Sequence, residues 1–124
     1  KESLKGLVFA VEAGSAGEEA VKELGNKYSA VKDQAAALME VAAGTSDACI
    51  IDLLMAGAMI GEGTSYENLT YTVKLTTEEY GVGFKKGSDL TEKLNQFFKD
   101  AYADGSMMET AKKYGVQESI IEQK

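Results

Sequence analysis

Two short stretches of this sequence carry residue types that could bind a small charged molecule. The first, "VEAGSAGE" (11–18), joins an apolar run to the start of a helix through small residues. A helix that begins at Ser15 offers unpaired backbone N–H groups and a partial positive charge, which suit a carboxylate or a phosphate. The second is Asp52, which directly follows the apolar run "ACII" and could bind an ammonium group. Glu12 lies beside the first stretch and could face either a ligand or water.

Each of these features also has a purely structural explanation. Ser15 and Glu18 have the spacing of a capping box, so Ser15 could do no more than cap its own helix. Asp52 could likewise be the N-cap of the helix that follows it, and Asp33 is expected to cap another. The turn lacks the lysine of a P-loop and does not fit G-x-G-x-x-G, so it gives little support to nucleotide binding. The pair Glu18 and Glu19 is expected at the solvated surface.

The amino-acid composition excludes several classes of function. The 124-residue chain contains no His and no Arg, and all 13 basic residues are Lys. Without His, it cannot build a Ser-His-Asp or Cys-His catalytic unit or the common zinc sites. The formal net charge of −7 argues against nucleic acid and anionic membranes as partners. Cys49 lies in an apolar run and is expected to be a buried, inert thiol.

The hydrophobic pattern predicts that strands and helices alternate along most of the chain. Strands are expected at 7–13, 27–32, 47–52, 69–75 and 80–86, and helices at 15–25, 33–44, 53–60, 88–105 and 106–115. A last amphipathic piece with Val116, Ile120 and Ile121 follows. This order predicts an α/β fold with a mostly parallel sheet and helices on both faces. Ligands of such folds bind at the carboxyl ends of the strands, where residues 13–16 and Asp52 both fall.

Helical spacing also predicts which faces of three helices are apolar or capped. The helix over 33–44 should bury Ala35, Leu38, Met39 and Ala42. The helix over 88–105 carries one apolar stripe of Leu90, Leu94, Phe97, Phe98 and Ala101. Ser106 and Glu109 have the spacing of a second capping box.

Three blocks of the sequence resemble the substrate-binding proteins of amino-acid ABC transporters, the periplasmic-type, two-lobed solute-binding family 3. They are "LKGLVFAVEAGSAGEEAV", "DQAAALMEVAAGTSDACIIDLLMA" and "EEYGVGFKKGSDLTEKLNQFFKDAYADGSMMETAKKYG". The blocks follow the family's order and spacing and cover roughly residues 4–115. The resemblance implies that residues 4–78 form the second lobe of a type II periplasmic-binding-protein fold. It implies that 79–124 returns to pack its helices on the first lobe, which this chain lacks.

The resemblance also implies a role for each candidate site residue. The α-carboxylate of a bound amino acid would take N–H groups at the start of the helix, and its α-ammonium would pair with Asp52. The corresponding turn is formed by Gly14, Ser15, Ala16 and Gly17. Many members of the family carry Ser or Thr where this chain has Ala16, so a hydroxyl contact would be lost there. Glu12 corresponds to a position that often touches the ligand side chain, which would suit a polar or cationic amino acid. The family's carboxylate-clamping Arg belongs to the first lobe, which is consistent with the absence of Arg here.

The function implied by this resemblance is capture of an L-amino acid outside the cytoplasm and its delivery to a membrane permease. The protein would be a ligand-binding protein and not an enzyme, with no catalytic residue, metal or cofactor. It would lie in the periplasm or at the cell surface as a lipoprotein, and this chain would be part of a longer protein. Without its first lobe, the apolar stripe of Leu90, Leu94, Phe97 and Phe98 would favour self-association.

Two other functions fit the same pattern. One is a receiver-type signalling domain with Asp52 as the phosphoacceptor, although such a domain needs an acidic pair after its first strand and only Glu12 is present there. The other is a ligand-sensing or catalytic relative that keeps the same fold.

Overall fold

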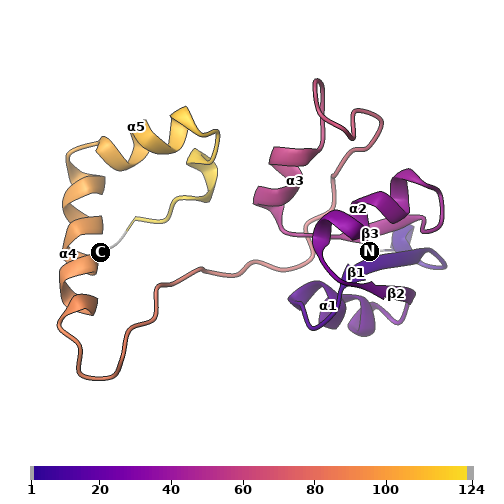
Figure 1. Cartoon of the computed structure of the whole chain (residues 1–124), viewed down its shortest axis with the longest axis horizontal. Helices are drawn as coiled ribbons and strands as arrows, with labels where there is room; N and C mark the ends of the chain where they lie inside the picture. Colours follow the sequence, from indigo (N-terminus) through magenta and orange to yellow (C-terminus); the bar gives the residue numbers. More distant parts are fainter. Residues whose placement is uncertain (1, 123–124) are drawn as a thin grey trace. The chain divides into compact units, whose positions relative to one another are not determined.

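The computed structural model describes residues 2–122, and the chain divides into two compact units, residues 1–77 and 78–124 (Figure 1). The first unit contains three strands, β1 (Val8–Glu12), β2 (Lys27–Val31) and β3 (Ala48–Ile50). They form a parallel sheet in the order β2-β1-β3. Its three α-helices are α1 (Ala16–Leu24), α2 (Gln34–Ala42) and α3 (Leu53–Met59), and a 3-10 turn, η1 (Glu2–Leu4), precedes β1. The α/β fold with a parallel sheet predicted from the sequence is therefore confirmed for this unit.

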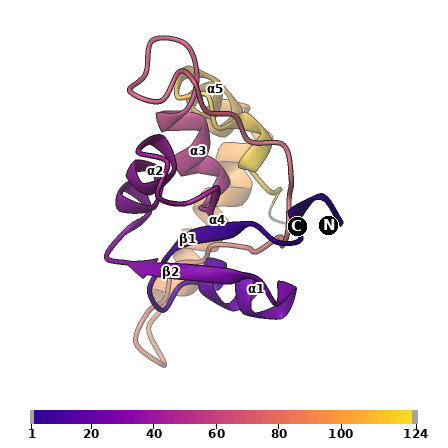
Figure 2. The ribbon, with the colours of Figure 1, turned by 90° about the vertical axis from the view of Figure 1, so that its right-hand side faces the viewer.

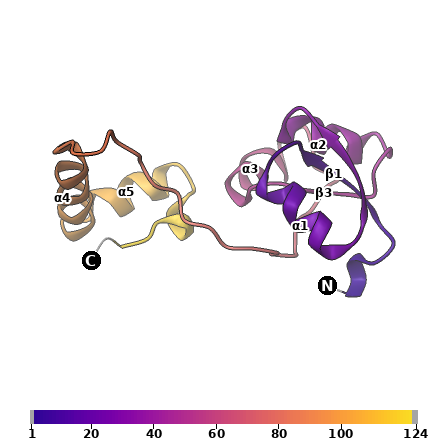
Figure 3. The same ribbon diagram turned by 90° about the horizontal axis from the view of Figure 1, so that it is seen from below.

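The strand order determines where the first two helices lie. The chain moves from β1 to β2 through α1, and then back across β1 to β3 through α2. Because right-handed crossovers in opposite directions leave opposite faces of a sheet, α1 and α2 should cover different faces. Figures 2 and 3 show this arrangement, with α1 on one side of β1 and β2 and α2 on the other.

The core of this unit lies between β1 and α1. Phe9, Val11 and Val21 form its buried centre, and partly buried apolar residues pack around them: Leu4, Leu7, Tyr28, Ala48 and Ile50. Alternation alone would expose every second residue of β1, yet Phe9, Ala10 and Val11 are all buried because helices cover both faces of the central strand.

The buried face of α2 differs from the sequence prediction. Ala37 and Leu38 are fully buried, whereas Met39 is 62% exposed and Ala42 is exposed. The helical spacing was correct, but the face was assigned about one residue too far along the helix. Alanine occurs on nearly every side of this helix, so the apolar pattern alone did not determine which side faces the sheet.

The segments 69–75 and 80–86, which were predicted as strands, form neither strand nor helix. In the first of these, Tyr71 and Val73 are both 48% exposed. An alternating pattern supplies one apolar face, but a strand also needs a neighbouring strand to pair with and a layer to cover it. Neither segment has a strand partner in the part of the chain that the structure describes.

The second unit contains α4 (Leu90–Ala103), α5 (Ser106–Lys113) and a 3-10 turn, η2 (Gln117–Ser119). The two predicted helices are confirmed, and the turn η2 lies within the final amphipathic piece. The predicted capping box of Ser106 and Glu109 is not formed, because Ser106 is already the first residue of α5. Instead, the Ser106 amide donates to Asp104 Oδ1 at 2.8 Å, and its hydroxyl donates to the Ala101 carbonyl at 3.3 Å. Within residues 2–122, no helix combines the length and apolarity needed to cross a bilayer.

Candidate functional site

The carboxyl ends of the three strands meet at one edge of the sheet. Glu12, the last residue of β1, is paired with Val31, the last residue of β2, and Val11 is paired with Ile50 at the end of β3. The loops that follow these strands lead into α1, α2 and α3. This edge therefore brings together the starts of three helices, and it holds every site residue predicted from the sequence.

Two contacts connect these three helix starts. The side-chain oxygen Oε1 of Gln34, the first residue of α2, accepts a hydrogen bond from the Asp52 amide at 2.9 Å. On the other side, Gly17 in the first turn of α1 lies against Ile50. A Cβ atom built at Gly17 would lie 3.2 Å from both the carbonyl oxygen and Cγ2 of Ile50. Asp52 follows Ile50 by two residues, so the start of α1 lies beside the end of the strand that leads to Asp52.

Ser15 is the N-cap of α1, as the sequence predicts. Its Oγ accepts a hydrogen bond from the Glu18 amide at 3.2 Å and donates one to the Glu12 carbonyl at 2.7 Å. These bonds hold the turn between β1 and α1, and Gly14 permits its tight path with φ of +75°. Within the described part of the chain, the amides of Ala16 and Gly17 donate no hydrogen bond, so they remain available to an anion.

Glu18 is the feature of this site that the sequence prediction placed wrongly. Its side chain is only 16% exposed, not solvated, because it makes three contacts. Oε2 accepts from the Gly14 amide at 2.7 Å, and Oε1 accepts from the Tyr28 hydroxyl at 3.1 Å and pairs with Lys22 Nζ at 2.8 Å. The bond from Lys22, then those from Gly14 and Tyr28, lower the pKa of Glu18 to about 2.

The Glu18 contacts modify the expected capping box. In the usual box the glutamate at this position returns to the amide of the N-cap residue. Here the Ser15 amide donates to the Glu12 carbonyl at 3.2 Å, and Glu18 binds the Gly14 amide instead. The carboxylate of Glu18 is therefore drawn toward the β1–α1 turn, and Lys22 offsets its charge.

Asp52 is the N-cap of α3, the structural alternative that the sequence left open. Its Oδ1 accepts from the Leu54 amide at 2.8 Å and from the Met55 amide at 3.4 Å. Asp52 is half-buried. Capping and ligand binding are compatible, because one carboxylate has two oxygens and about four acceptor positions.

The other predicted residues have mostly structural partners. Asp33 caps α2, and its Oδ1 accepts from the Ala36 amide at 2.7 Å, as predicted. Glu12 is half-buried at the end of β1, where its backbone supports the Ser15 turn. Burial raises the pKa of the Cys49 thiol to about 11, which agrees with the expectation of an inert thiol. Across residues 2–122, no group of three or more acidic, Cys or His side chains is placed to hold a metal ion.

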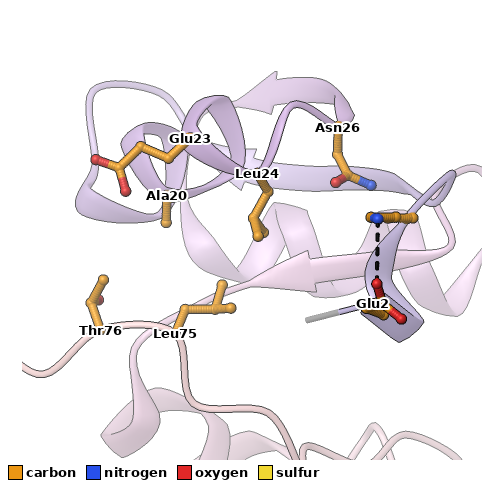
Figure 4. Close-up of a pocket in the computed structure, with 8 residues that line it drawn as sticks. Glu2, Ala20, Glu23, Leu24, Asn26, Leu75 and Thr76 are labelled. Atoms are coloured by element: carbon orange, nitrogen blue, oxygen red, sulfur yellow. Dashed lines mark ion pairs between the residues drawn. The ribbon is translucent and has the colours of Figure 1, made fainter.

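A shallow hollow of about 300 Å³ lies at the other end of the first unit, near the start of β1 and β2 (Figure 4). Ala20, Leu24 and Leu75 contribute its apolar wall, and Glu2, Lys5, Glu23, Asn26 and Thr76 complete the lining. The side-chain amide of Asn26 is used within the fold, because its Nδ2 donates to the carbonyls of Leu4 and Leu7 at 2.7 and 3.0 Å. The exposed Glu2–Lys5 ion pair lies 3.6 Å apart at its rim. This hollow contains none of the predicted site residues.

Comparison with known proteins identifies no relative: no family model, no curated protein and no solved structure matches the chain. The class that the fold defines is therefore a small α/β domain with a three-stranded parallel sheet.

Proposed function

We propose that the first unit is the amino-acid-binding lobe of an extracytoplasmic solute-binding protein that delivers its ligand to an ABC permease. The ligand α-carboxylate would bind the amides of Ala16 and Gly17, with Ser15 shaping the turn. Its α-ammonium would pair with Asp52. The sequence resemblance suggests these roles, and the intact protein would lie in the periplasm or at the cell surface as a lipoprotein.

The observation that carries this proposal is the proximity of a free helix start to a carboxylate on one edge of the sheet. The Gly17–Ile50 contact holds the first turn of α1 against the end of β3, two residues before Asp52. An α-amino acid carries its opposite charges on adjacent groups, so its binding site needs an anion site and a cation site close together. The approach of α1 to the end of the strand that leads to Asp52 supports such a pair of sites.

The Glu18 carboxylate bears on the strength of the anion site. A free carboxylate near the helix start would repel the ligand's own carboxylate. Lys22 pairs with Glu18 at 2.8 Å, however, and the Gly14 amide and Tyr28 hydroxyl also bind it. The compensated Glu18 leaves the amides of Ala16 and Gly17 as the nearest donors to an incoming anion.

The same reasoning predicts weak binding by this chain alone. High affinity for a small, hydrated amino acid needs both charged ends to be paired in a closed, dry cleft. The absence of one buried charged partner typically costs about 3–5 kcal/mol, or roughly a hundred-fold to several-thousand-fold in affinity. We expect the first lobe and its arginine to supply this contribution in a longer protein.

A thermal-shift screen with the L-amino acids tests the proposal. A ligand that binds only the folded protein stabilises it by RT ln(1 + [L]/Kd), so millimolar ligand should give a small, selective increase in Tm. The increase should disappear in Asp52→Asn, since Asn keeps the N-cap of α3 but removes the charge. Asp33→Asn is the matched control, because it makes the same change at the N-cap of α2 and should leave the shift intact. Equal shifts with all amino acids, or a shift that survives Asp52→Asn, would contradict the proposal.

A further inference from the structure

We propose that two copies of this chain associate through α4, packed antiparallel along an apolar stripe. The α4 stripe consists of Leu90, Leu94, Phe97 and Phe98. This inference requires no ligand and does not depend on the proposed function.

The α4 stripe is large relative to the apolar core of its own unit. Leu90 is 49% exposed and Phe97 is 59% exposed, while Leu94 and Phe98 are half-buried. In this unit the fully buried hydrophobic residues, among those described, are only the alanines at 101 and 111. A unit of this size rarely stabilises itself with so small a core, so the stripe is expected to be covered in solution.

The spacing of the stripe matches the seam of a two-stranded coiled coil. Leu90, Leu94 and Phe97 are separated by four and three residues, which is the d-a-d spacing of a heptad. The next position in this spacing is Ala101, which is already buried within its own unit. Lys93 and Asp100 occupy equivalent positions beside this seam, seven residues apart, and their charges are opposite. The charges at such flanking positions determine the orientation of the partner helix.

These charges favour an antiparallel second copy. When Leu94 of one copy faces Phe97 of the other, Lys93 of each copy comes beside Asp100 of its partner, so two opposite-charge pairs form. A parallel pair would place Lys93 opposite Phe98, and Asp100 opposite Gly105 beyond the helix, and neither charge would then find an opposite charge. The positions of Lys93 and Asp100 therefore favour a second copy of α4 as the partner and an antiparallel orientation of the two helices.

The contacts within α4 leave both charged groups able to make these pairs. Lys93 Nζ lies 2.6 Å from Asp89 Oδ2, and both side chains are about 70% exposed. Asp100 Oδ1 accepts from Gln96 Nε2 at 2.8 Å on the helix surface. Exposed charges of this kind contribute more to orientation than to affinity. A single 14-residue helix gives an interface smaller than the usual stable size, so we expect the association to be weak and to depend on concentration.

Analytical ultracentrifugation of the 124-residue chain, from about 10 µM to about 1 mM, tests the proposal. The wild-type mass should rise with concentration from that of a 13.2 kDa monomer toward twice that value. Lys93→Asp and Asp100→Lys should each weaken the dimer by about tenfold, since each creates two like-charge pairs. The double variant, Lys93→Asp with Asp100→Lys, should restore the wild-type Kd.

The control variant is Lys99→Asp. It makes the same charge change as Lys93→Asp, but its position on α4 is away from the stripe. It should leave the Kd unchanged, and circular dichroism of every variant should show wild-type helicity. A chain that stays monomeric at 1 mM would overturn the proposal and would indicate that another protein segment covers α4. The antiparallel α4 interface would be overturned if the single charge reversals left the dimer Kd unchanged. It would also be overturned if the double variant failed to restore the wild-type Kd.

Discussion

Replacement of Ser15 by Ala should destabilise the first unit through two hydrogen bonds at once. The Ser15 Oγ accepts from the Glu18 amide and donates to the Glu12 carbonyl. Loss of an N-cap side chain costs about 1 kcal/mol, and loss of a second partly buried hydrogen bond costs about 0.5–1.5 kcal/mol. We expect the free energy of unfolding to fall by about 2 kcal/mol, which for a domain of this size lowers Tm by about 8–16 °C.

Thermal and urea unfolding followed by far-UV circular dichroism measure this loss directly. Ser15→Thr is the matched control, since it keeps a hydroxyl that can both donate and accept, and it should lose less than half as much stability. Asp33→Ala removes a cap whose side chain accepts a hydrogen bond from the Ala36 amide, and its loss of stability should lie between those of the two Ser15 variants. If Ser15→Ala lowers Tm by less than about 2 °C, the β1–α1 turn is not held by the serine hydroxyl and the reasoning is wrong.

Two further predictions concern the same edge of the sheet. The pKa of Glu18 falls from 4.5 to about 2 on folding, so its contribution to stability is complete above pH 4.5 and is lost as the pH falls toward 2. Urea midpoints should therefore decline more steeply over this range in the wild type than in Glu18→Gln, and parallel profiles would contradict the assigned contacts. Gly17→Val should cost about 1–3 kcal/mol in the unfolding free energy, because even a Cβ there would lie 3.2 Å from the Ile50 carbonyl oxygen. Gly17→Ala should cost less, since alanine gains up to about 1 kcal/mol in helix propensity, and equal losses for the two variants would show that the contact is not steric.

The parts of the fold that the sequence predicted best are those determined by neighbouring residues. Ser15 and Asp33 were predicted as caps, and capping was one of the two roles left open for Asp52, because a capping side chain and its amide partner lie two or three residues apart. The end of α1 at Gly25 has the same basis, since a left-handed residue there, with φ of +73°, is supplied most easily by glycine.

Features that depend on distant residues were predicted less well. The segment 69–75 has the alternation of a strand but belongs to none, because strand formation depends on an available partner and not only on the pattern. The Gln34–Asp52 bond joins residues 18 apart, and an amide side chain carries no signal of such a partner. Glu18 was placed at the surface because its Tyr28 partner lies on β2, ten residues away, and the sequence does not show that the two side chains meet.

The candidate site shows the same division between local and long-range information. The sequence located both charged elements, the start of α1 and Asp52, from the strand-turn-helix pattern around each. Their proximity follows from the strand order β2-β1-β3, which places β3 beside β1, and from the absence of a side chain at Gly17. The sequence alone offered no basis for the role of that glycine in bringing α1 against Ile50.

The most direct test of the central claim is an NMR titration of the ¹⁵N-labelled chain with the L-amino acids. The account predicts that at least one amino acid shifts the amide signals of Ala16, Gly17 and Asp52 together, at millimolar concentration. The matching compound without its α-amino group should shift Ala16 and Gly17 but leave Asp52 in place, and Asp52→Asn should weaken binding of the amino acid but not of that compound. No shift at Ala16 and Gly17 with any amino acid, or shifts confined to another part of the chain, would contradict the proposed site.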